Sequence, residues 1–242
     1  MLVAAAICPC PPLLVPEVAA GAAPELEALR AASFDAVGVL AAARPDRLIV
    51  IGPAEQAGRG PHPQGAVGSF RGFGVELEVP LGAVSPGSPG SPGAERELPP
   101  SLTVGAWLLS RTEWADAPVE GLGVGEPLAR DRCLPVGREI AASAERVALL
   151  VMGDGSACRS VKAPGYFDER AEGFDTAAAR ALGAADIAAL RALDEELAFD
   201  LRASGRACWQ VLAGAAEGAG LQGRLLREEA PYGVGYFAAT WS

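Results

Sequence analysis

Short, fully apolar segments alternate with stretches of helical periodicity along the chain, and this alternation limits the folds open to it. Residues 2–7, 47–52 and 146–154 are apolar runs with the length of buried strands. Residues 24–43 place apolar side chains at helical spacing between the first two runs. Strands that are apolar on both faces are typical of parallel sheets covered by helices. The pattern predicts one three-layer α/β/α domain over residues 1–242, with a central, mostly parallel or mixed sheet.

The other elements continue the alternation. Residues 73–79 alternate apolar and polar side chains, which predicts a strand with one face in water. Residues 85–93 read SPGSPGSPG and predict a flexible surface loop, because neither a helix nor a ladder can form there. We also expect strands at 119–124, 224–228 and 233–241, and helices at 101–114 (with a serine cap), 135–145, 168–182, 186–203 and 209–219. The four tryptophans, Trp107, Trp114, Trp209 and Trp241, are expected in the core.

Composition excludes several classes of partner. The net charge of −10 argues against nucleic acid, because a phosphate backbone needs clustered basic side chains. No apolar run reaches the roughly 20 residues that span a bilayer, so we expect no membrane segment. The apolar N-terminus lacks a basic flank, and the five cysteines are unevenly spaced. These features predict a cytoplasmic protein with reduced thiols.

Unusual residues follow three of the predicted strands. Ligands of open α/β sheets bind beyond the carboxyl ends of the strands, where the following loops meet. The first strand leads into Cys8 and Cys10 and the second into the loop of His62, the sole histidine. The third leads into residues 153–162. We therefore expect these loops to form a site at one edge of the sheet.

Cys10 and His62 are the candidate metal ligands. Thiolates of Cys8 and Cys10, with His62 and Cys158, could bind zinc, although the spacing matches no familiar zinc pattern. Cys8 is also interpreted as a small buried apolar residue, whereas Cys10 lies beyond the strand and is the better functional thiol. His62 lies among prolines and glycines in what we expect to be a stiff, exposed loop. Any histidine general base would have to be this residue.

The loop of residues 153–162 supplies the candidate ligand-binding residues. One interpretation is a tight turn after the strand. The other is a cluster of backbone N–H groups that holds an anionic ligand beside basic side chains. Neither a nucleophile elbow nor a nucleotide-binding glycine motif is present. The residues in question are Asp154, Ser156, Cys158, Arg159 and Lys162.

The opening segment ICPCPPLLVPE, residues 7–17, resembles that of class III extradiol ring-cleavage dioxygenases of the catalytic (B) subunit type. The resemblance continues through residues 48–52, the His62 loop, residues 151–158 and residues 230–237, so it spans nearly the whole chain. Memo-like proteins share this fold. The resemblance implies an α/β/α domain with ferrous iron held by two histidines and a carboxylate.

The chain departs from the pattern that the resemblance implies. Cys10 stands where the family reads C-P-H-P-P and places its first iron ligand, and His62 matches the second. The acid/base histidine of the family would fall near Cys158, where this chain has none. A thiolate in place of an imidazole favours zinc or copper(I) over iron. For the third ligand no carboxylate stands in a matching motif; those in the right part of the chain are Glu217, Glu228 and Glu229.

These departures weigh against ordinary ring cleavage. We expect an extradiol dioxygenase-like domain that lacks the standard iron site and binds a small ligand, anionic or aromatic. The alternative is a metal-dependent oxidoreductase, of the ring-cleavage type or with a Memo-like copper or zinc site, in which Cys10 replaces a histidine. The candidate metals are Fe(II), Zn and Cu, and none is assigned. The sequence does not specify the oligomeric state.

Overall fold

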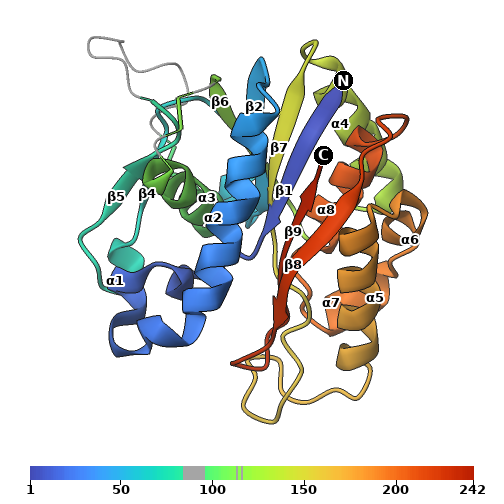
Figure 1. The fold of residues 1–242 in the computed structure, drawn as a ribbon. Helices are drawn as coiled ribbons and strands as arrows, with labels where there is room; N and C mark the ends of the chain where they lie inside the picture. The colour runs from blue at the N-terminus through green and yellow to red at the C-terminus, as the bar shows by residue number, and fades with distance from the viewer. Residues whose placement is uncertain (84–95, 113, 116) are drawn as a thin grey trace.

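The computed structural model describes residues 1–83, 96–112, 114–115 and 117–242. A seven-stranded mixed sheet runs through this part of the molecule, with helices on both faces (Figure 1). The expected three-layer α/β/α fold is therefore confirmed. The strands lie in the order β3-β6-β2-β7-β1-β9-β8. Their bounds are β1 Leu2–Cys8, β2 Arg47–Pro53, β3 Gly60–His62, β6 Val119–Val124, β7 Val147–Met152, β8 Gly223–Glu229 and β9 Tyr236–Trp241.

The centre of the sheet is parallel and its edges are antiparallel. Strands β6, β2, β7 and β1 run in one direction, while β3 pairs antiparallel with β6 and β9 antiparallel with β1. After β2 the chain moves toward β6, whereas after β7 it moves toward β8 and β9. The loops that leave β2 and β7 therefore separate. Such a switch point opens a crevice beyond the carboxyl ends of the strands.

Each face of the sheet carries its own layer (Figure 1). One layer holds α2 and α3 with a two-stranded sheet, and the other holds α4 to α8. The first layer comprises α1 (Pro16–Ala19), α2 (Glu27–Ala42), α3 (Pro100–Arg111), β4 (Val67–Ser69) and β5 (Glu78–Pro80). The second comprises α4 (Arg130–Ala142), α5 (Ala171–Ala184), α6 (Ile187–Arg191), α7 (Glu195–Asp200) and α8 (Arg206–Ala215).

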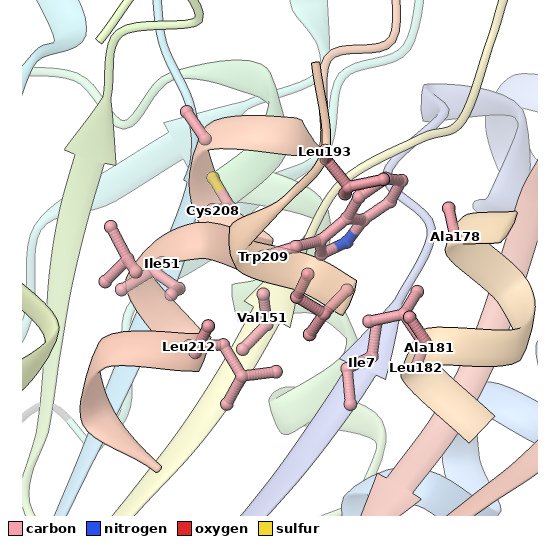
Figure 2. Packing of buried hydrophobic residues seen from close by; sticks show 14 of the residues in the cluster. Ile7, Ile51, Val151, Ala178, Ala181, Leu182, Leu193, Cys208, Trp209 and Leu212 are labelled. Atoms are coloured by element: carbon pink, nitrogen blue, oxygen red, sulfur yellow. The ribbon is translucent and has the colours of Figure 1, made fainter. Parts of the chain in front are cut away.

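Alternate side chains of the central strands serve two cores, because successive residues of a strand point to opposite faces. On β7, Leu149 and Val151 face the α8 layer, whereas Leu150 and Met152 face the α2 and α3 layer. Figure 2 shows the first core, where strand side chains meet α5 and α8 around Trp209. The labelled residues are Ile7, Ile51, Val151, Ala178, Ala181, Leu182, Leu193, Cys208, Trp209 and Leu212. All four tryptophans are buried, as predicted.

Several predicted elements have other bounds. The strand predicted at 73–79 is wrong for most of its length. A 3-10 helix occupies Arg71–Phe73, Gly74 ends it at φ 83°, and only Glu78–Pro80 is a strand. The helix predicted at 186–203 is divided into α6 and α7, because Asp194 caps a new helix by accepting from the N–H of Leu197.

The serine cap predicted for α3 is also wrong. Pro99 is the N-cap residue, and the Ser101 hydroxyl instead donates to the carbonyl of Pro53 at 2.6 Å. The loop predicted at 85–93 lies outside the described residues. Where the structure describes the chain, its helices are too short or too polar to cross a bilayer. The five cysteines are free thiols, and all are buried.

Candidate functional site

A cavity of about 630 Å³ opens beyond the carboxyl ends of the parallel strands. Residues that follow β1, β2 and β6 line it, together with the segment that enters α3 and the turn before α8. It therefore lies where the loops separate at the switch point of the sheet. Its volume falls within the range of small-molecule sites. The lining residues are Cys10, Pro53, Ala54, Glu55, Ala57, Gly58, Ser69, Gly72, Phe73, Arg96, Glu97, Leu98, Pro99, Pro100, Ser101, Glu126 and Ser204.

Cys10 brings the opening motif of the chain to this cavity. The side chain is 8% exposed, whereas Cys8, at the end of β1, is fully buried with its thiol 3.8 Å from the carbonyl of Ser33. Burial, and next the charge of Asp154, raise the pKa of the Cys10 thiol well above its ordinary value. Cys10 is therefore a protonated thiol at neutral pH. In that form it acts as a weak donor and a soft contact surface in the cavity.

Asp154 lies behind Cys10, two residues after β7. Its Oδ1 accepts the backbone N–H of Cys10 at 2.8 Å, which fixes the Cys10 segment against the end of β7. Burial raises the pKa of Asp154 to about 7, and the bonds from Cys10 oppose that rise. Asp154 and Cys10 in turn add to the effect of burial in raising the pKa of Tyr236 on β9. The sequence placed Asp154 and Cys10 at one edge of the sheet, and the structure brings them into contact.

His62 lies elsewhere, and the prediction of an exposed loop is wrong. The residue ends β3, is 1% exposed, and pairs with Gly121 in the middle of β6. A Cβ on Gly121 would lie 3.2 Å from the Cβ of His62, so this glycine leaves room for the ring. Nε2 lies 2.9 Å from the carbonyl oxygen of Gly58, and burial lowers the pKa of the imidazole. His62 is a neutral side chain packed under the cavity wall and is not among the residues that line the cavity.

The donors implied by the family resemblance do not fit a metal centre. In the described part of the chain, no three His, Cys, Asp or Glu side chains come together as a metal-binding group. Nε2 of His62 bonds the carbonyl of Gly58, its Nδ1 has no partner in the described residues, and His62 does not line the cavity beside Cys10. Two of the candidate third ligands have partners on the surface: Glu217 pairs with Arg138 and Arg191, and Glu229 pairs with Arg227.

After Asp154, the loop of residues 153–162 takes part in a buried hydrogen-bond network of Ser156, Arg159 and Asp175, called the sealed network below. Asp175 of α5 accepts the Ser156 N–H and the Ser156 hydroxyl, each at 2.7 Å, and Nη1 of Arg159 at 3.2 Å. Ser156 and Asp175 are both fully buried. The backbone N–H groups of Gly155, Ala157 and Arg159 donate to carbonyls of other segments. The N–H groups of Gly155, Ser156, Ala157 and Arg159 are therefore engaged within the protein and are not free to hold an anion.

The last two candidates also lie apart from the cavity. The Cys158 thiol is buried 3.5 Å from the carbonyl of Leu201, and Lys162 is exposed on the loop. Arg159, expected beside an anionic ligand, already pairs with Asp175 and Glu172. Of the predicted residues, the structure therefore groups Cys10 and Asp154 at the cavity, and Ser156 and Arg159 in the sealed network.

The prediction missed several cavity residues. Glu126 follows β6, a strand that was predicted, so the carboxyl-end rule that selected Cys10 could have found it. Phe73 was assigned to a predicted strand but lies in a 3-10 segment, and Ser204 lies in a turn that no strand pattern marks. Arg96 and Glu97 follow the SPG repeat, and nothing in the sequence indicated that the chain returns there to the sheet edge.

The fold and cavity define a class: an α/β/α protein with a crevice at the switch point of a mixed sheet. Among solved structures, the uncharacterized protein JW3007 from Escherichia coli K12 is similar, with a TM-score of 0.54 and 15% sequence identity. The similarity covers 99% of this chain and 100% of that one. At this identity the likeness shows the fold alone. No protein-family model and no curated protein matches the chain.

Proposed function

We propose that this chain is an extradiol dioxygenase-like domain that binds a small organic molecule in the cavity beside Cys10. One observation carries the proposal: a cavity of about 630 Å³ lies at the switch point of the sheet and is open to ligand-sized molecules. Its wall combines apolar side chains, such as Phe73 and Leu98, with a few polar groups. This mixture is typical of sites that bury the body of a ligand and orient it through polar contacts.

Binding is favoured over the metal-dependent alternative by the arrangement of the donors. An oxygenase of the two-histidine type needs open coordination positions on a metal held by three converging side chains. Here the described His, Cys, Asp and Glu side chains form no group of three that could hold a metal ion, and His62 is not among the residues that line the cavity. An organic molecule can enter the cavity without a metal held by His62 or Cys10.

The cavity can be blocked without disturbing the fold. Gly72 lines it, is exposed, and has no atom within 4 Å of the position that a Cβ would take. We expect Gly72→Trp to place an indole at the cavity mouth while the free energy of unfolding stays within about 0.5 kcal/mol. Ligand-observed NMR with phenethylamine, 2-phenylethanol and 3-phenylpropanoate measures the effect, and at least one of these probes should lose binding.

Gly21→Trp is the matched control. Gly21 also lies in an exposed 3-10 segment with no atom within 4 Å of a Cβ, and it is not among the cavity residues. Wild type and Gly21→Trp should bind the same probes equally. Failure of all three probes to bind wild type, or equal binding by Gly72→Trp, would overturn the proposed function.

A further inference from the structure

We infer that the ligand of this cavity is an organic cation, an amine or related group joined to an apolar body; the inference rests on the proposed function. Of the two ligand classes expected from the sequence, anionic and aromatic, a cationic ligand differs from the first and is compatible with the second. The charges on the cavity wall, the position of Arg96 and the apolar side of the cavity support it.

Carboxylates reach the cavity from three separate segments. Glu55 follows β2, Glu126 follows β6, and Glu97 lies just before α3. None of the three pairs with a basic side chain in the residues that the structure describes. Asp154, which accepts the N–H of the lining residue Cys10, is a further carboxyl group beside the cavity but does not line it. Glu55, Glu97 and Glu126 are all exposed, and charges of one sign grouped along a cleft raise the local concentration of the opposite charge.

Arg96 is the one basic side chain among the described lining residues, and its guanidinium is already engaged. Nη1 donates to the carbonyl of Arg59 at 3.0 Å, and Nη2 donates to the carbonyl of Pro61 at 2.6 Å. Both carbonyls belong to the segment around β3, so the guanidinium faces that backbone. These bonds use two of the five guanidinium donors, so an anionic ligand could still reach Arg96, but it would bind beside three carboxylates that form no ion pair, and their repulsion disfavours it.

The rest of the wall suits the uncharged body of such a ligand. Leu98, Pro99 and Pro100 line the cavity from the start of α3, and Phe73, which is 43% exposed, lines it from the 3-10 segment. An aromatic face attracts a cation as well as an apolar group. The buried Cys10 thiol borders the same space and adds no charge of its own at neutral pH.

The test compares three probes of similar size and different charge: phenethylamine, 2-phenylethanol and 3-phenylpropanoate. Their dissociation constants for wild type are measured by NMR titration at pH 7 and low salt. A single exposed ion pair contributes little to affinity. Three of them, between the amine and Glu55, Glu97 and Glu126, should together make the amine bind about tenfold more tightly than the carboxylate. Glu126→Gln and Glu97→Gln should each weaken the amine by about two- to fivefold and leave the alcohol unchanged.

Glu139→Gln on α4 controls for the overall negative charge, because Glu139 is exposed and lies outside the cavity lining. It should leave the affinity for the amine unchanged. Equal loss in Glu139→Gln and Glu126→Gln would overturn the inference, since attraction would then come from the whole molecule. Binding of the alcohol or the carboxylate as tightly as the amine, abolished in Gly72→Trp, would also overturn it while the proposed function stands. Binding of none of the probes would refute the proposed function itself.

Discussion

Two carboxyl groups lie near the carboxyl end of β7, Asp154 partly exposed and Asp175 fully buried, and their surroundings differ. Asp175 is fully buried, and its two oxygens accept from the Ser156 N–H, the Ser156 hydroxyl and Arg159. Asp154 accepts the backbone N–H of Cys10 and borders the cavity residues Cys10 and Ser204. No basic side chain pairs with Asp154 among the described residues. One carboxyl group is therefore satisfied inside the protein, and the other retains acceptor capacity beside an open space.

In the loop of residues 153–162, Ser156 and its partner Asp175 therefore stabilise the fold, whereas Asp154 positions Cys10 at the cavity. A carboxylate with three protein donors holds segments together, and a ligand could not reach it. Gly155 and Gly235 pack directly on Asp175, since a Cβ on either would lie 2.6 or 2.5 Å from one of its oxygens. Asp154, on the other side of the same loop, holds Cys10 in place and leaves the cavity accessible.

The largest predicted effect breaks the sealed network. Asp175→Asn replaces an acceptor-only carboxylate by an amide and leaves Arg159 and one Ser156 donor without a full partner. We expect the free energy of unfolding, measured by urea denaturation at pH 7, to fall by about 3 kcal/mol or more, as for other broken buried ion pairs. Asp154→Asn keeps an acceptor for the Cys10 N–H and should lower it by less than about 1 kcal/mol.

This pair of matched substitutions tests the comparison directly. Equal losses in the two variants would mean that Asp154 is as much a structural residue as Asp175. A small loss in Asp175→Asn would mean that its hydrogen bonds contribute little beyond their desolvation penalty. The slope of the denaturation curve should stay the same in both variants, since neither changes the area exposed on unfolding.

The fold could be predicted because periodicity reports burial, and burial decides the layers. The apolar run of residues 146–154 became β7 at the centre of the sheet, and the four tryptophans became core residues. The ends of several helices and strands were instead set by local interactions and backbone conformation. Asp194 starts a new helix inside a continuous helical pattern, and Gly74 ends a 3-10 turn where alternation indicated a strand. Both choices depend on single hydrogen bonds or backbone angles that periodicity does not record.

The site could be predicted only as far as the strand ends. Cys10 and Asp154 follow two neighbouring parallel strands, so their contact follows from the topology. His62 could not be placed, because residues 60–62 form a strand only through their pairing with β6. Neither proline nor glycine favours a strand, and the tertiary context overrode local preference here. Asp175 was missed because it lies within a helical pattern and faces Ser156 only after the chain has folded.

The next effect in size concerns pH. The pKa of Asp154 is about 7 in the folded protein, against an ordinary value of 3.8. The folded state therefore keeps a proton that the unfolded state loses, so the stability of the wild type falls as the pH rises from about 4 to about 7. Relative to Asp154→Asn, which does not titrate, this loss should reach about 1–2 kcal/mol after allowance for partial solvation.

Urea denaturation of both proteins at several pH values measures this difference, and the difference curve should be flat above about pH 7. Glu139→Gln, measured in the same way, should follow the wild type over the whole range. A difference curve that stays flat between pH 4 and pH 7 would show that Asp154 titrates as an ordinary surface carboxyl group, which would contradict its desolvation beside Cys10.

The smallest predicted effect is a difference in alkylation rate between two thiols, Cys10 at the cavity and Cys158 in the loop of residues 153–162. Cys10 is 8% exposed at the cavity, whereas Cys158 is 2% exposed beside the carbonyl of Leu201. Burial raises the pKa of both thiols, so alkylation of the native protein by iodoacetamide should be slow at pH 7 and faster at pH 9. Peptide mass spectrometry should find Cys10 modified a few times faster than Cys158, because the reagent can reach it through the cavity.

Gly72→Trp should slow the modification of Cys10 and leave that of Cys158 unchanged. Modification of Cys158 faster than that of Cys10 would contradict the conclusion that only Cys10 is reached from the cavity.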